Sequence, residues 1–523
     1  MKDKKASSLL KEIFIPGLFF SLIIAAVTAY FSPGEMSAGF RAALILALPS
    51  SIGLCCVWHW GGRGKTLAIM MLLAFGLRLG FGLATQNLLP IFGYPDEPQQ
   101  QRGYLFDDAW RRDEEAWRIA QEESPSFFNT ISRTYNNDQY GGLAALSIWI
   151  YKGLSPDVRR FGLIVMLGAF FSAAGVPFLR KGLQSWVSAS DPHYKHLPNI
   201  AAWIYVLYPD SIVFAASPMR EPFLTGILAV AFWALLTMRD NWKRSTQVLF
   251  GCLLLCLPFS YFIAGALLTS IALWIWGYYL IPASKKWLIG GILVIVLGAL
   301  AVGLLALPAV QEFIHYDIHV SELNSGWVEK VVGEIGGQFR SVFLAVYGIA
   351  QPVLPAILFY QPTTPYWKIV GIYRALGWYL LVPFLFYALF SAFRVKRKPE
   401  KYVFILNALF VIGWIFISSL RAGGDQWDNP RYRVIMLPWL AFFSAWGICY
   451  AKKIKDWWLV RWIIIELIFV IFFSQWYYSR YSGDAIRRFP FWKTVTYIVV
   501  SSALVFATGL IGPIRRKLKG KKN

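Results

Sequence analysis

Residues 103–117 read GYLFDDAWRRDEEAW, a charged stretch that follows an apolar segment. It holds five carboxylates in a chain that is otherwise mostly hydrocarbon. If the stretch is helical, Asp107 pairs with Arg111 and Asp108 pairs with Arg112 at i,i+4 spacing. Its apolar side chains form an incomplete face, which predicts a helix lying in a membrane interface rather than crossing the membrane. The alternative is a solvated, salt-bridged surface helix.

The composition is typical of a polytopic membrane protein. Of 523 residues, 57% are hydrophobic and 15% are charged, whereas about a quarter are charged in soluble domains. The formal net charge is +22, but the basic residues lie largely in short links between apolar segments. The positive-inside rule accounts for this pattern, so nucleic acid is not an expected partner. The five cysteines all lie within apolar segments, which indicates small core residues.

The apolar segments predict an all-α polytopic membrane protein with about 14 transmembrane helices and with interfacial helices in its outer loops. A hairpin at 245–281, broken at Pro258, supplies two of them. The remaining spans are expected at roughly 13–31, 41–58, 67–86, 160–180, 198–216, 222–239, 287–308, 368–393, 402–420, 434–451, 457–476 and 493–512.

The basic links predict the orientation of these spans. With about 14 spans, the basic clusters all fall on one side, so both termini are expected to be cytoplasmic. The first long outer loop is then 87–159, and it carries the charged stretch. The second long outer loop is 309–367.

Acidic and arginine side chains recur in three of the outer loops, where they would converge on one membrane surface. A carboxylate there could deprotonate an acceptor hydroxyl, and arginines could hold a leaving phosphate. The candidate residues are Asp107, Asp108 and Asp113 in the first loop, Arg220 and Glu221 in the next, and Arg431, Tyr432 and Arg433 in the last.

The candidate residues of the second and third loops also have simpler interpretations. Arg431 and Arg433 could reach toward lipid head groups from the start of a helix. Arg220 and Glu221 could form a local ion pair that caps the following helix.

Five short motifs lie within roughly residues 67–450. They are Leu77-Arg78-Leu79, Asp107-Asp108-Ala109, Ser217-Pro-Met-Arg-Glu-Pro222, Asn429-Pro-Arg-Tyr-Arg433 and Leu437-Pro438. Taken together, these motifs resemble those of the polytopic GT-C glycosyltransferases, in particular the bacterial branch similar to protein O-mannosyltransferases and lipid A aminoarabinose transferases. The resemblance implies transfer of a sugar from a polyprenyl-phosphate-linked donor to a glycan, lipid or protein acceptor, with inversion. It implies an active site at the outer face of the bacterial inner (plasma) membrane.

The resemblance also implies roles for individual residues. Asp108 is the expected general base, with Asp107 beside it and Asp113 as a third candidate, and Glu221 is the acid of the second turn. The expected ligands of the carrier phosphate are Arg431 and Arg433, joined by Arg220 and Tyr432. The implied domains are a catalytic module at 67–450, two additional N-terminal helices within 1–66, and C-terminal helices with a basic tail at 451–523.

Two other functions are compatible with the same sequence. A lipid-linked oligosaccharide ligase or polymerase would transfer preassembled chains rather than single sugars. A transporter or lipid flippase would distribute ionisable groups through the depth of the bilayer, whereas most of the charge here lies in loops. No cofactor is certain: the outer acids could hold a divalent metal ion through oxygen ligands, or act without one. Membrane lipids are expected partners in every case.

Overall fold

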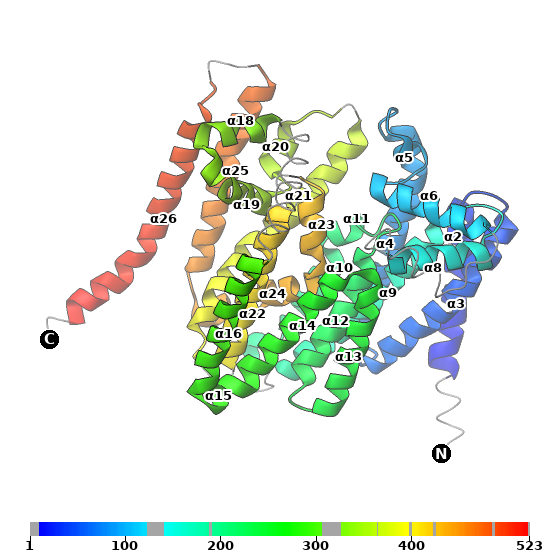
Figure 1. The fold of residues 1–523 in the computed structure, drawn as a ribbon, viewed down its shortest axis with the longest axis horizontal. Helices are drawn as coiled ribbons and strands as arrows, with labels where there is room; N and C mark the ends of the chain where they lie inside the picture. Colours follow the sequence, from blue (N-terminus) through cyan, green and yellow to red (C-terminus); the bar gives the residue numbers. More distant parts are fainter. Residues whose placement is uncertain are drawn as a thin grey trace. The chain divides into compact units, whose positions relative to one another are not determined.

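The computed structural model describes residues 10–122, 141–187, 191–305, 326–362, 364–396, 400–421, 425–483 and 487–520. Every regular element within these ranges is a helix, and none is a strand (Figure 1). The predicted all-α class is therefore confirmed for the described part of the chain.

Within the described ranges, nine helices are long and apolar enough to cross a membrane, or ten if a pair bent by 77°, α23 (Asp428–Ile435) and α24 (Leu437–Ile454), forms one span. They indicate a membrane protein. The prediction of about 14 spans also counted shorter segments, such as α12 (Glu221–Thr237), which has 17 residues. The nine spans contain α2 (Ile15–Phe31), α3 (Met36–Trp60), α4 (Lys65–Phe92), α9 (Gly162–Trp186), α14 (Tyr261–Ile275) with η3 (Trp276–Leu280) and α15 (Ile281–Ala283), α21 (Pro365–Ser391) with η5 (Ala392–Arg394), α22 (Glu400–Arg421), α25 (Trp458–Tyr481) and α26 (Phe491–Gly520).

The helices group into two compact units. The first comprises Met1–Asp191, Lys195–Ile271 and Val434–Ala441, and the second comprises Pro192–Tyr194, Ala272–Arg433 and Phe442–Asn523, each as far as it is described. The catalytic module predicted at 67–450 includes parts of both units.

In the first unit, α9 packs along α12, α4 and α3 (Figure 1). Three glycines of α9 face its neighbours at seven-residue spacing. A Cβ at Gly168 would press on Pro222, one at Gly175 on Tyr205 and Ala229, and one at Gly182 on the backbone of Trp233. Small residues let helix backbones approach closely where lipid supplies no hydrophobic drive for association. Around this core lie η1 (Leu10–Phe14), α5 (Pro98–Gln101), α6 (Asp107–Gln121), α8 (Gly141–Leu154), α10 (Leu197–Leu207), α11 (Pro209–Val213) and α13 (Trp242–Phe259).

The span predicted at 198–216 is broken into two pieces. Helix α10 ends at Leu207, and the short helix α11 begins at Pro209. Proline lacks the N–H that would continue the helix, and it disfavours the helical conformation of the residue before it. The last carbonyl groups of α10 therefore need partners from elsewhere.

A buried arginine from α4 supplies those partners. Arg78 is fully buried, and its guanidinium donates to the carbonyl oxygens of Tyr205 at 3.2 Å and of Val206 at 3.4 Å. It also donates to Ser211 Oγ on α11 and to the carbonyl oxygen of Ala74 in its own helix. Arg78 thus connects α4 to both sides of the break.

In the second unit, α21 packs against α22, α25 and a short helix, α20 (Leu354–Phe359), and α25 also packs against α26. Tryptophans fill part of this core, and Trp378 and Trp476 are both buried. The other helices of this unit are η2 (Pro192–Tyr194), α16 (Lys285–Leu305), α18 (Gly326–Ile335), η4 (Gly337–Phe339) and α19 (Arg340–Ala350).

Replacing Arg78 with methionine should destabilise the first unit, because it removes the donors to two buried carbonyl groups. Leaving buried polar groups without partners costs about 1–3 kcal/mol each, so Arg78→Met should lower the free energy of unfolding by at least about 2 kcal/mol. Thermal unfolding in detergent measures this. Arg41→Met, at an exposed position of α3, is the matched control, and equal melting temperatures for the two variants would contradict the assignment.

Candidate functional site

The charged stretch forms a single amphipathic helix, α6. Arg111 Nε lies 2.8 Å from Asp107 Oδ2, and Arg112 NH1 lies 3.0 Å from Asp108 Oδ2. Both predicted i,i+4 pairs are therefore confirmed. The Asp107 side chain is 50% exposed and that of Asp108 is 23% exposed. The two acids occupy the first turn of α6, where the partial positive charge of the helix N-terminus favours carboxylates.

The other face of α6 is buried and, apart from Asp113, apolar. Ala109, Ala116 and Ala120 are buried on it, and α6 packs against α8. Ala116 and Ala120 belong to a core cluster with Leu143 and Tyr151 of α8. The helix is thus fixed along its length, with its charged face outward.

The chain just before α6 lies against the chain that leads to α12. The N–H of Leu105 donates to Ser217 Oγ at 3.0 Å. The Phe106 ring stacks on Phe214, with centroids 5.3 Å apart. Gly103 permits this path, because its φ of +79° suits glycine and a Cβ there would collide with the Gln86 carbonyl. The structure therefore brings together two of the segments that the sequence predicted to converge.

Arg220 and Glu221 are buried where α12 begins. Arg220 Nε lies 3.7 Å from Glu221 Oε1, and both side chains are at most 2% exposed. Arg220 also donates to the carbonyl oxygen of Phe259, the last residue of α13, at 3.3 Å. The local ion pair considered from the sequence is thus present. Removing one partner would leave a buried charge, which is strongly destabilising.

Asp113 has different surroundings from the two acids at the start of α6. Its side chain is buried and accepts hydrogen bonds from the hydroxyl groups of Tyr104 and Tyr151, the latter at 2.6 Å. Burial raises the pKa of Asp113 to about 6, although both hydroxyls and the nearby Arg159 act to lower it. Since Tyr104 precedes α6 and Tyr151 belongs to α8, this carboxylate holds three segments together.

The remaining sequence-predicted residues lie in the second unit, on α23. Arg431 is buried, and its NH1 lies 3.7 Å from Asp428 Oδ1. Arg433 is also buried, donates to the Gln351 carbonyl at 2.8 Å, and lies over the Trp378 ring at 3.3 Å from its centroid. The backbone carbonyl of Tyr432 accepts a hydrogen bond from Trp414 at 3.1 Å. This segment is therefore a packed part of the unit.

Comparisons with protein-family models, with curated proteins and with solved structures give no match. The roles proposed below therefore depend on the residues of this chain and on the motif resemblance.

The acids at the start of α6 do not form a metal site with other ligands in the described part of the chain. No group of three or more His, Cys, Asp or Glu side chains there is placed to hold a metal ion. Asp107 and Asp108 face arginines instead.

Two contacts near the candidate residues were not predicted from the sequence. Arg374 of α21 is buried, donates to the Gln426 carbonyl at 3.0 Å and lies over the Trp427 ring at 3.9 Å. The position of Arg374 inside an apolar segment could have indicated a buried, paired side chain, because charge within a span is costly and usually paired. The tyrosine pair on Asp113 had no such signal, since Tyr104 and Tyr151 are far apart in sequence.

Replacing Gly103 with alanine should displace the segment before α6. The positive φ and the contact with the Gln86 carbonyl both oppose a Cβ, so hydrogen–deuterium exchange in residues 104–112 should become faster. Gly80→Ala is the control, because a Cβ at Gly80 of α4 meets nothing within 4 Å. Unchanged exchange in Gly103→Ala would show that this position does not constrain α6.

Replacing Asp113 with asparagine should remove a pH dependence of stability. The folded state keeps a proton on Asp113 up to pH about 6, while the unfolded chain releases it near pH 4. The stability of the native protein should therefore fall, relative to Asp113→Asn, as pH rises through this window, by up to about 3 kcal/mol. Melting temperatures of both proteins from pH 4 to 7.5 test this. Parallel pH profiles would contradict it, and Glu115→Gln, at an exposed site on α6, is the control.

Proposed function

We propose that this protein is a membrane glycosyltransferase that moves a sugar from a polyprenyl-phosphate-linked donor to a glycan, lipid or protein acceptor. In this proposal it has a GT-C-like fold of about 14 spans, acts at the outer face of the bacterial inner membrane, and keeps both termini in the cytoplasm. The observation that supports it most is the contact between the start of α6 and the segment before α12. Leu105 and Phe106 meet Ser217 and Phe214 there, so the acidic turn of α6 and the Arg220–Glu221 pair belong to neighbouring segments.

Asp108 is the base in this mechanism. It accepts the proton of the acceptor hydroxyl while the acceptor oxygen bonds to the anomeric carbon. The bond between that carbon and the phosphate oxygen breaks at the same time, and polyprenyl phosphate leaves with the bonding electrons. Attack from the face opposite the phosphate inverts the anomeric centre. Asp107 is the more exposed neighbour and the second candidate for the base.

The developing phosphate charge needs fixed cations. The resemblance assigns this role to Arg431 and Arg433, joined by Arg220 and Tyr432. Guanidinium groups suit it because their planar N–H forks match phosphate oxygens and stay charged near lipid. Glu221 holds Arg220 by an ion pair, so we give it a positioning role, as we do Asp113.

The placement of two buried arginines favours an enzyme over a transporter or flippase. A transport path would use ionisable groups inside the spans. Arg78 and Arg374 do lie inside candidate spans, but both donate to backbone carbonyls of neighbouring segments, which gives them a structural task. A ligase or polymerase of lipid-linked oligosaccharides would use the same surface chemistry, and it differs in the size of the donated chain.

A donor assay tests the proposal. Purified protein in nanodiscs is offered a panel of radiolabelled polyprenyl-phospho-sugars, with and without divalent metal, and release of polyprenyl phosphate is measured. Asp108→Asn should lower the rate by about a hundredfold to ten-thousandfold, because a general base contributes this much. Glu115→Gln removes an exposed carboxylate of the same helix and should leave the rate unchanged.

The outcomes separate the mechanism from the function. Full activity in Asp108→Asn, with activity lost in Asp107→Asn, would move the base to Asp107. A native protein that consumes no donor of the panel would overturn the proposed function, and assays with preassembled lipid-linked oligosaccharides and with lipid transport would follow.

A further inference from the structure

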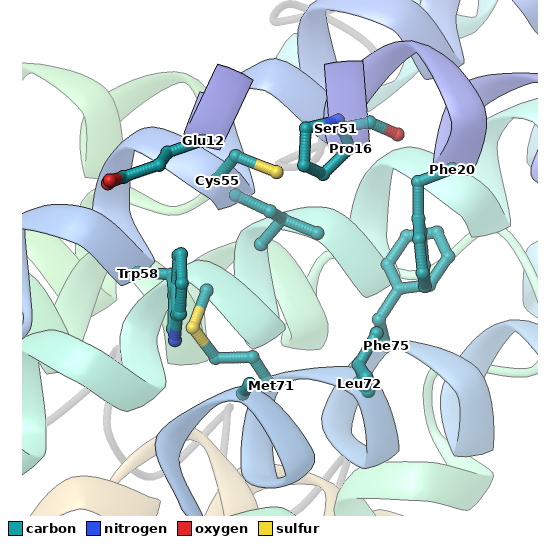
Figure 2. Close-up of a pocket in the computed structure, with 11 residues that line it drawn as sticks. Glu12, Pro16, Phe20, Ser51, Cys55, Trp58, Met71, Leu72 and Phe75 are labelled. Carbon is teal, nitrogen blue, oxygen red and sulfur yellow. The ribbon is translucent and has the colours of Figure 1, made fainter. Parts of the chain in front are cut away.

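Three helices of the first unit, α2, α3 and α4, surround an apolar pocket of about 320 Å³ that contains none of the candidate site residues (Figure 2). All three belong to candidate membrane spans. The lining residues are Glu12, Pro16, Phe20, Ser51, Leu54, Cys55, Trp58, Ala68, Met71, Leu72 and Phe75.

The pocket lining extends along two of its helices. Its lining on α4 runs from Ala68 to Phe75, which is seven residues and therefore about 10 Å along the helix. Its lining on α3, from Ser51 to Trp58, covers the same length. Figure 2 shows Glu12 and Trp58 toward one end and Phe20 and Phe75 toward the other. This length and volume suit a segment of one hydrocarbon chain, whose burial is favourable.

One end of the pocket is charged. Arg63, in the turn between α3 and α4, lies 2.6 Å from Glu12 Oε2 through its NH1 and also contacts His59. Its φ of 55° places it in the left-handed region, which is uncommon for a residue with a side chain. Lys65 begins α4, and no side chain caps that helix start. Arg63 therefore meets Glu12 at this end of the pocket, and Lys65 follows two residues later in the sequence. Two basic residues beside one acid favour an anionic group.

We propose that this pocket binds one acyl chain of an anionic phospholipid, with its phosphate held at Arg63 and Lys65. The hydrocarbon lining recognises the chain, and the excess positive charge at one end recognises the head group, at about 1 kcal/mol for each basic residue. The proposal is independent of glycosyl transfer, because it uses neither α6 nor the arginines of α23.

Native mass spectrometry of the delipidated full-length protein tests this site. Phosphatidylglycerol and phosphatidylcholine with identical chains are added in equal amounts, and the lipids retained on the protein are counted. The native protein should keep one more phosphatidylglycerol than Ala68→Phe, which fills the pocket. Ile69→Phe, at a 50% exposed neighbouring position of α4, should keep the native number. Arg63→Gln should reduce the preference for phosphatidylglycerol about fivefold.

A second variant, Leu54→Phe, fills the pocket from α3 and covers the case in which Ala68→Phe misfolds. Each filling variant is first shown to be monodisperse by size-exclusion chromatography. Loss of the same lipid in either monodisperse variant supports the site. Retention of that lipid in both filling variants overturns the proposal. Equal retention of the two phospholipids by the native protein also overturns it, because the charged end would then have no role.

Discussion

The hydrogen bonds from Arg78 to the carbonyls of Tyr205 and Val206 are the interaction on which the first unit depends. A helix broken inside a packed core leaves backbone acceptors that have no partner within the helix. The Arg78 guanidinium donates to these acceptors and so stabilises the irregular segment after Leu207. That segment carries Ser217, which accepts the N–H of Leu105. The position of the acidic turn of α6 therefore depends on an arginine that belongs to a different helix.

In the second unit, two buried arginines also donate hydrogen bonds to backbone carbonyls. Arg374 donates to the Gln426 carbonyl and covers Trp427, and Arg433 donates to the Gln351 carbonyl and covers Trp378. In each case an N–H edge meets a carbonyl while the flat face meets an indole ring, a combination that lysine cannot reproduce. Buried arginines in this protein thus join helical segments to irregular ones.

Local features of the sequence predicted local structure well. The i,i+4 pairs of α6 and the helical class follow from spacing and hydropathy, and both are confirmed. Pro209 explains why one predicted span is broken, although segment hydropathy alone did not reveal it. The environment of Asp113 could not be predicted, because its tyrosine partners lie on separate segments and only tertiary packing brings them together.

The buried carboxylate between α6 and α8 couples these two helices. Tyr151 reaches Asp113 through its hydroxyl and meets Trp117 through its ring. A change of side chain at any of these three positions would therefore alter the packing of both helices, so a disturbance of α6 can originate in α8.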